Sequence, residues 1–268
     1  MRSVLFCPAS NARALAKAVA LTCDAVIVDL EDAVGGDNKA AARENAEWAF
    51  GQGFGAKTAA LRVNSIGTAA HLEDLDLARR IKPAALVVPK AEDVGSLQSV
   101  TMAFDGPVWL MIETAKGVLN AGALAAAPTV AALILGPNDL RVSLGAEEDP
   151  ERRPLQYAMS AVVTAARAAG ILAFDGVYNN FKDKAGLSEE ARQGKLFGFH
   201  GKTLIHPEQI DPVNIAYSAS ADEIERAQKV IAAFNTGGGN AVALDGELIE
   251  ELHVNAAIEL LKREGISR

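Results

Sequence analysis

The 268-residue chain is poor in cysteine and in aromatic residues. Cys7 and Cys23 are its only cysteines, and they do not form a Cys-x-x-Cys pair. A disulfide framework and a cysteine-based zinc site are therefore not expected, and both thiols should be reduced, as is usual in cytoplasmic proteins. Aromatic residues make up 5% of the sequence, which disfavours a surface that binds ligands by stacking.

Basic clusters are missing as well. The chain carries 26 Lys and Arg residues against 34 Asp and Glu, a formal net charge of −8, so nucleic acid is not an expected partner. A net negative protein can still bind an anionic substrate, because a local basic pocket can oppose the overall charge.

Long apolar runs are also absent. Residues 121–136 are rich in alanine, but Pro128 and Thr129 interrupt them, so the segment is too short to span a bilayer. The apolar run within residues 1–8 is too short for a signal peptide and is more typical of a first strand. We therefore expect a soluble, cytoplasmic protein with no membrane partner.

What the chain does contain is an alternation of two patterns. Short β-rich apolar runs are separated by Ala- and Leu-rich charged segments with helical spacing. Repeated βα units of this kind indicate a parallel sheet, and a closed (β/α)8 TIM barrel is the simplest arrangement. An open doubly wound sheet is the alternative, but no Gly-x-Gly-x-x-Gly motif follows the first run. The runs lie at residues 3–6, 25–30, 59–63, 84–88, 108–112, 131–135, 172–177 and 202–205.

The end of the chain has a different character. A triple glycine within residues 236–240 precedes a short strand-like piece, a turn at Asp245-Gly246 and a last helix over 250–263. A break of this kind is typical of a hinge. We therefore expect a barrel with the active site over residues 1–235, and a lid or arm over 236–268 that packs on a neighbouring subunit. A loose tail is the alternative, although the segment has its own apolar pattern.

Two acids stand at matching places after buried runs. Glu113 follows the run 108–112, and Asp139 follows the run 131–135 after three intervening residues. The C-terminal ends of parallel strands meet at the face where barrels place their chemistry. Two carboxylates that converge there suit a hard cation such as Mg²⁺. The alternative is that each acid caps the helix that follows it.

Further charged residues follow other runs. Arg62, at the end of the third run, is suited to bind a substrate carboxylate through two parallel hydrogen bonds, and Lys90 is a second candidate for substrate binding. The alternative for both is a structural ion pair with Glu31 or Asp32. Within the acid group 29–32, some members are expected to orient metal-bound water, and at least one to act as a cap or an ion-pair partner.

Three cations lie on early helices or loops. Lys17, Lys39 and Arg43 are candidates for binding the phosphates of a cofactor. A solvated helix face is the simpler explanation for all three.

Motifs along almost the whole chain resemble those of the citrate lyase β-subunit-like family, which includes malyl-CoA and citramalyl-CoA lyases within the HpcH/HpaI aldolase superfamily. The matching segments are RSVLFCP at 2–8, DLEDAV at 29–34 with Lys39 and Arg43, LRVN at 61–64, PK at 89–90, IETAKGVLN at 112–120, GPNDL at 136–140, DGVY at 175–178 and GKTLIHP at 201–207.

The resemblance implies a (β/α)8 barrel and Mg²⁺-dependent, reversible carbon–carbon cleavage of a 3-hydroxyacyl thioester. The substrate would be a malyl, citramalyl or citryl thioester of CoA, and the products a 2-oxo acid and an acetyl thioester. Glu113 and Asp139 would hold the metal, with Glu113 also near the substrate, and Arg62 would contact the substrate carboxylate or thioester oxygen. A homotrimer or hexamer is implied, with the C-terminal segment reaching a neighbour's site.

One departure from the family pattern concerns the C-terminal segment. Relatives often carry Asp at the end of an Asp-Gly-x-x-(Ile/Val)-Asp pattern, whereas this chain has Glu250 there. Glu250 is the expected catalytic base, on a side chain one methylene longer. Two alternatives therefore stay open: a metal-dependent aldolase of free hydroxy-oxo acids, and a weakly active or non-catalytic subunit of a larger complex.

Overall fold

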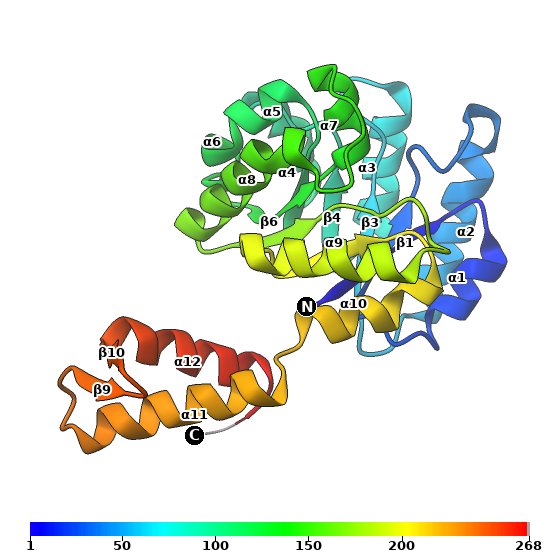
Figure 1. The fold of residues 1–268 in the computed structure, drawn as a ribbon. Coiled ribbons are helices and arrows are strands. Elements are labelled where there is room, and N and C mark those ends of the chain that lie inside the picture. The colour runs from blue at the N-terminus through cyan, green and yellow to red at the C-terminus, as the bar shows by residue number, and fades with distance from the viewer. Residues whose placement is uncertain (267–268) are drawn as a thin grey trace. The chain divides into compact units, whose positions relative to one another are not determined.

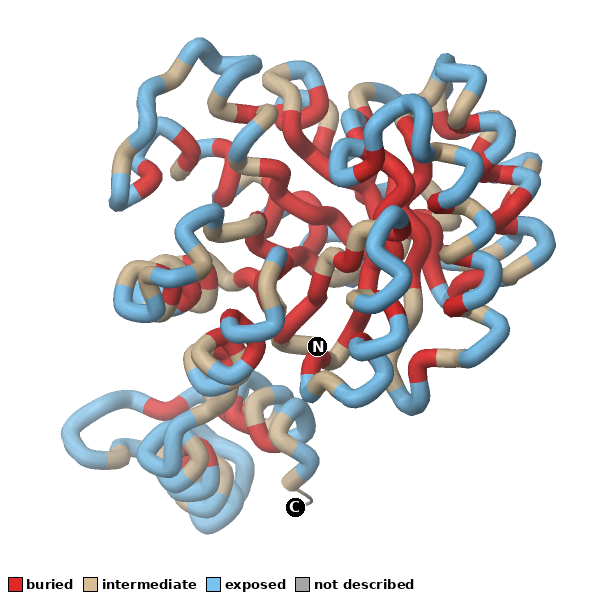
Figure 2. Tube along the Cα trace, turned by 90° about the vertical axis from the view of Figure 1, so that its right-hand side faces the viewer, coloured by how far each residue is buried: buried red, intermediate tan, exposed pale blue. Residues whose placement is uncertain are grey.

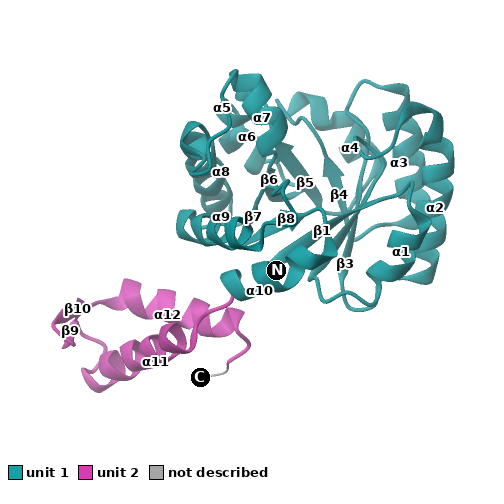
Figure 3. Ribbon diagram, turned by 45° about the vertical axis from the view of Figure 1, so that its right-hand side comes forward, with its two compact units in different colours: residues 1–217 teal, residues 218–268 magenta. Residues whose placement is uncertain are grey.

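The computed structural model describes residues 1–266. These form two compact units, Met1–Tyr217 and a second unit that begins at Ser218 (Figure 3). The first unit is an α/β barrel, and the second is a small unit of two helices and a hairpin.

The first unit contains eight parallel strands that close into a barrel in sequence order, with β8 pairing back onto β1 (Figure 1). This confirms the predicted (β/α)8 barrel. Each expected apolar run is a strand, because runs buried on both faces favour parallel sheets over helices of the same composition. The strands are β1 Ser3–Pro8, β2 Ala25–Asp29, β3 Thr58–Arg62, β4 Ala85–Val88, β5 Val108–Ile112, β6 Val130–Leu135, β7 Leu172–Asp175 and β8 Gly201–Leu204.

Helices surround the barrel and bury its outer face (Figure 2). In the first unit they are α1 Ala12–Ala18, α2 Lys39–Gln52, α3 Ala69–Ile81, α4 Gln98–Ala103, α5 Ala115–Leu119, α6 Ala121–Ala125, α7 Pro137–Leu144, α8 Gln156–Ala169, α9 Lys184–Phe197 and α10 Ile210–Tyr217. Short 3-10 turns are η1 Gly36–Asn38, η2 Gly95–Leu97, η3 Arg153–Leu155 and η4 Pro207–Gln209.

Alternate strand residues fill the inside of the barrel. Small side chains such as Ala25 and Ala60 share one cluster with large ones, and the rings of Trp109 and Phe174 lie with centroids 5.5 Å apart. Because side chains alternate in and out along a strand, the inward rows that begin with these apolar residues continue to the C-terminal ends. On β2 the row is Ala25, Ile27 and then Asp29, so an acid is delivered to the barrel mouth.

A buried ion cluster lies between the barrel wall and the helices. The Lys202 ammonium, fully buried, donates to Asp175 Oδ2 at 2.9 Å and to Glu190 Oε1 at 2.7 Å. Arg152 donates to the other Asp175 oxygen at 2.7 Å. The cluster lowers the pKa of Asp175: burial opposes ionisation, but Lys202 and Arg152 outweigh it.

The second unit is built from α11 Ala221–Thr236, a hairpin of β9 Val242–Leu244 and β10 Glu247–Ile249, and α12 Glu251–Arg263. The expected turn at Asp245-Gly246 joins the two strands, and both residues have positive φ (52° and 85°), as a two-residue hairpin turn of this type requires. Val230 of α11 packs with Ile249 and Val254 in one apolar core. The division at residue 217 precedes the expected boundary at 235, because α11 shares its buried face with α12.

Among the described residues, no helix combines the length and the apolar character that crossing a bilayer requires.

Replacing Lys202 by Met should lower the free energy of unfolding by roughly 3–5 kcal/mol, because it leaves Asp175 and Glu190 buried with one cation fewer. Urea denaturation measures the loss, and Lys184→Met, at the exposed start of α9, is the control. Equal stability of the two variants would contradict a structural role for the cluster.

Candidate active site

A pocket of about 470 Å³ opens at the C-terminal ends of the strands. It is formed by the inward rows described above, so residues from distant parts of the chain meet there. Its lining includes Phe6, Asp29, Arg62, Met111, Glu113 and Thr203 from the barrel, and Asp139 from the start of α7.

Arg62 is fixed by a bidentate ion pair with Asp29. Its Nε and one terminal nitrogen donate to the two Asp29 oxygens, each at 2.7 Å, and both residues are buried. Burial disfavours the charge, but the hydrogen bonds and the charge of Asp29 outweigh it and raise the pKa of Arg62. The guanidinium is therefore permanently charged and held in one orientation.

The other terminal nitrogen of Arg62 lies 2.9 Å from Glu31 Oε2 and 3.7 Å from the sulfur of Met111. The guanidinium also stacks over Phe6, 4.8 Å from the ring centroid. The nitrogen that donates to Asp29 Oδ2 carries two N–H groups. Only one of them donates to an acceptor within residues 1–266. Because Arg62 lines the pocket, this second N–H is available to a ligand there. The expected ion pair and a ligand-binding role are thus compatible, with Asp29 as the main partner.

Glu113 is a buried acid with one fixed oxygen. Its Oε1 accepts the backbone N–H of Lys90 at 2.7 Å. Burial raises the pKa of Glu113 to about 7, and the charges of Glu31 and Asp139 add to the rise. It does not cap α5, because the Thr114 hydroxyl accepts the Gly117 N–H instead.

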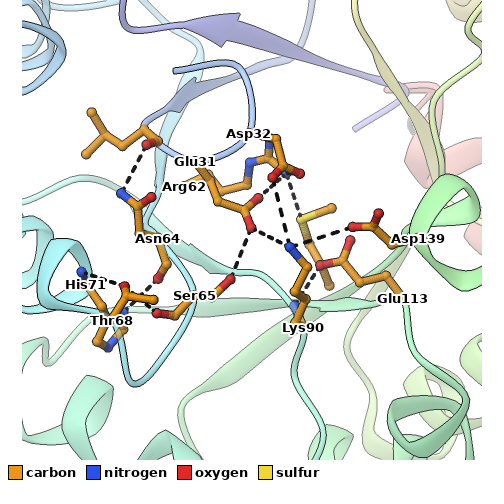
Figure 4. A network of polar contacts seen from close by, with 12 residues as sticks. Glu31, Asp32, Arg62, Asn64, Ser65, Thr68, His71, Lys90, Glu113 and Asp139 are labelled. Atoms are coloured by element: carbon orange, nitrogen blue, oxygen red, sulfur yellow. Dashed lines mark hydrogen bonds and ion pairs between the residues drawn. The ribbon is translucent and has the colours of Figure 1, made fainter. Parts of the chain in front are cut away.

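Asp139 lies in the first turn of α7, and its side chain is 43% exposed. Glu113 packs against Gly136, the residue before α7, where any β-carbon would overlap the carboxylate. Both acids line the same pocket, and Figure 4 shows their carboxylates side by side near Lys90. The structure thus brings the two predicted metal ligands together.

This pair of acids fits a hard divalent cation. Two carboxylates of like charge, one of them desolvated, repel each other until a cation neutralises them. In residues 1–266, no three Asp, Glu, His or Cys side chains gather to enclose a metal. An ion held by two carboxylates would complete its shell with water and substrate oxygens, as Mg²⁺ commonly does.

Two of the expected phosphate-binding cations have structural partners. The Lys39 ammonium donates to the carbonyls of Leu30 and Glu31, at 2.6 and 2.7 Å, and so holds the end of β2. Arg43 donates to Asp74 at 2.7 Å and also pairs with Glu73. Asp74 in turn accepts the backbone and side-chain N–H groups of Asn64, at 2.7 and 2.6 Å, which fixes the loop after β3.

Lys17 is on the exposed side of α1. Cofactor binding by Lys17, Lys39 and Arg43 stays a prediction, as does substrate binding by Lys90. Glu250 belongs to the second unit, where it is exposed and precedes α12, and its backbone N–H donates to His253 Nδ1 at 3.0 Å. Its catalytic role is likewise a prediction.

Several pocket residues were not singled out from the sequence. Phe6, Met111 and Thr203 face the pocket, and Asn179 pairs with Asn138 through two amide hydrogen bonds of 2.8 and 3.2 Å. The inward residues carry a usable signal, namely their even spacing from the apolar residues that fill the barrel. Asn179 lies on an irregular loop and carries no such signal.

Known proteins resemble this chain along most of its length. The model of the HpcH/HpaI aldolase/citrate lyase family matches residues 2–207. The chain belongs to this family. It is 41% identical to a (3S)-malyl-CoA thioesterase of Cereibacter sphaeroides, over 99% of this chain and 95% of that protein. It is 33% identical to the mitochondrial citramalyl-CoA lyase of Homo sapiens, over 93% of this chain and 81% of that protein.

Among solved structures, the chain resembles CitE of Mycobacterium tuberculosis in complex with magnesium, acetoacetate and coenzyme A. The TM-score is 0.87 at 32% identity, and the match covers 98% of both chains. Another solved structure, of a citrate lyase β subunit from the same organism with oxaloacetate and magnesium, covers 81% of this chain at a TM-score of 0.73 and 33% identity.

The raised pKa of Glu113 predicts a pH-dependent stability of the metal-free protein. Because the folded-state pKa lies near 7 and the ordinary value is 4.5, the acid favours folding below about pH 4.5 and opposes it as pH rises through 7. As pH rises from about 4.5 to above 7, the free energy of unfolding of the wild type should fall by about 3 kcal/mol relative to that of Glu113→Gln. Urea titrations in EDTA between pH 5 and 8.5 measure the difference, and parallel curves would contradict the assignment.

Proposed function

We propose that this protein is a Mg²⁺-dependent carbon–carbon lyase that acts on a 3-hydroxyacyl-CoA of the malyl or citramalyl type. The observation that carries the proposal is the convergence of Glu113, Asp139 and Arg62 in one pocket. The named activities of the relatives support CoA thioesters as substrates, and the magnesium in the related structures supports the choice of ion.

Glu113 and Asp139 are the residues that would hold the ion. When bound, Mg²⁺ supplies Lewis-acid polarisation of the substrate's hydroxyl and carboxylate oxygens. The pocket also excludes much of the solvent around Glu113, which strengthens electrostatic interactions with a bound substrate.

Arg62 would stabilise the charge that develops on the thioester oxygen as the C–C bond breaks. As the hydroxyl group loses its proton to solvent, the electron pair of the C–C bond passes to the acyl fragment, which becomes a thioester enolate. The hydroxyl carbon becomes the carbonyl of a 2-oxo acid. Since Asp29 already fixes the guanidinium, its unengaged N–H needs no reorganisation to reach a ligand oxygen. Glu250 would donate the proton that turns the enolate into an acetyl thioester.

Hydrolysis of the same thioester is the second candidate. It is supported by the malyl-CoA thioesterase, which is 41% identical over nearly the whole chain. In that reaction water adds to the thioester carbonyl and CoA thiol leaves, so malyl-CoA gives malate and CoA. Cleavage of the C–C bond instead gives glyoxylate and acetyl-CoA, with no free thiol.

Product analysis therefore separates the two reactions. With malyl-CoA and Mg²⁺, we expect a 2-oxo acid, trapped as its hydrazone, and acetyl-CoA. Arg62→Lys should reduce the rate by roughly 100-fold or more, because the fixed donor is lost. Arg80→Lys, on an exposed pair with Glu47, is the matched control. Free thiol in place of the 2-oxo acid would identify a thioesterase, and neither product would contradict both candidates.

We further propose a cytoplasmic homotrimer or hexamer in which the unit 218–268 of one subunit serves its neighbour's pocket. The test is subunit mixing. Arg62→Lys and Glu250→Gln homo-oligomers should each be nearly inactive, and co-refolded mixtures should recover part of the activity, because some sites combine an intact Arg62 with an intact Glu250. Activity that stays at the level of the separate variants would contradict action between subunits.

A further inference from the structure

Lys90 follows β4 in a backbone conformation that is uncommon for a residue with a side chain. Its φ is +51°, in the left-handed region. In this conformation its backbone N–H points to Glu113 and donates to Oε1 at 2.7 Å. The residue that orients the buried carboxylate also carries an ammonium near Asp32 and Asp139, which line the pocket.

The Lys90 ammonium lies among three carboxylates (Figure 4). It is 2.9 Å from Glu31 Oε1, 3.8 Å from Asp139 and 3.9 Å from Asp32. The bond to Glu31 is a full hydrogen bond, whereas the two longer contacts are electrostatic only. Because the side chain is 40% exposed and flexible, it can shift among these partners.

We propose that Lys90 is a built-in competitor of the divalent cation: its ammonium partly neutralises Asp139 when the metal is absent and moves fully onto Glu31 when the metal binds. This inference rests on the metal site of the proposed function. It assigns Lys90 a positioning role that sets metal affinity, in place of the substrate contact expected from the sequence.

Glu31 is the partner that makes this handover possible. It is buried, and it also contacts Arg62 and accepts the Ser65 hydroxyl at 3.2 Å, so its carboxylate is fixed. An ammonium that has this alternative partner can leave Asp139 without becoming an unpaired charge. Without Glu31, the ammonium would turn to Asp139 and oppose the metal more strongly.

The experiment measures Mn²⁺ binding by electron paramagnetic resonance at fixed pH and ionic strength, without substrate. Lys90→Asn removes the charge but keeps a residue that tolerates left-handed backbone. Lys116→Asn is the matched control. It removes an exposed cation of α5 that pairs with Glu92 and Asp93 in the loop after β4. Glu113→Gln should abolish tight binding and so tests the metal site itself.

We expect Lys90→Asn to lower the Mn²⁺ dissociation constant about tenfold, the scale of one unit charge a few ångströms from a bound ion. Lys116→Asn should change it by less than about twofold, as for exposed pairs. Glu31→Gln should weaken binding in the wild type and do so much less in the Lys90→Asn background.

Unchanged or weaker binding in Lys90→Asn would overturn the competitor role, and an equal effect of Glu31→Gln in both backgrounds would overturn the handover. In either case, the metal site is still supported if the wild type binds Mn²⁺ and Glu113→Gln does not. If the wild type itself binds no Mn²⁺, the metal site and the competitor role both fall.

Discussion

The structure of the site depends on an excess of negative charge at the barrel mouth. Asp29, Glu31, Asp32, Glu113 and Asp139 meet there, and the cations in contact with them are Arg62 and Lys90. Both oxygens of Asp29 accept hydrogen bonds from Arg62. Among the described residues, the other four acids therefore have only Lys90 and the remaining contacts of Arg62 to offset their charge. Burial raises the pKa of Glu113, and the charges of Glu31 and Asp139 raise it further. A divalent cation that binds between Glu113 and Asp139 would remove the imbalance, and this requirement links the fold to a metal-dependent reaction.

The barrel creates this imbalance because side chains alternate between its inside and its outside along each strand. Inward rows begin with residues such as Ala25, Ala60 and Trp109, which fill the interior, and end with Asp29, Arg62 and Glu113 at the mouth. The rigid sheet prevents these groups from moving apart, and the missing side chain at Gly136 lets Glu113 lie against the start of α7. The stability of the apolar core thus offsets the cost of holding like charges together.

The sequence predicts the barrel and the meeting of Glu113 and Asp139 in one pocket, because buried parallel strands have a continuous apolar signature and acids after such runs are conspicuous. It does not predict which acid pairs with which cation. That Asp29 rather than Glu31 or Asp32 is the main partner of Arg62 depends on strand register. The sequence also carries no signal for the positive φ of Lys90, whose N–H donates to Glu113. Nor does it predict that Lys39 and Arg43 fix the loops after β2 and β3. The second compact unit begins at Ser218, before the triple glycine, because α11 packs on α12.

The central claim is that Glu113 and Asp139 share one divalent ion next to Arg62. Crystals soaked in Mn²⁺ test it directly, because anomalous scattering locates the ion without any assumption about activity. The account predicts one strong peak in the pocket within about 2–2.3 Å of an oxygen from each acid, at the distances of hard divalent ions. A peak bound to only one of them, or no peak in the pocket at saturating Mn²⁺, would contradict it.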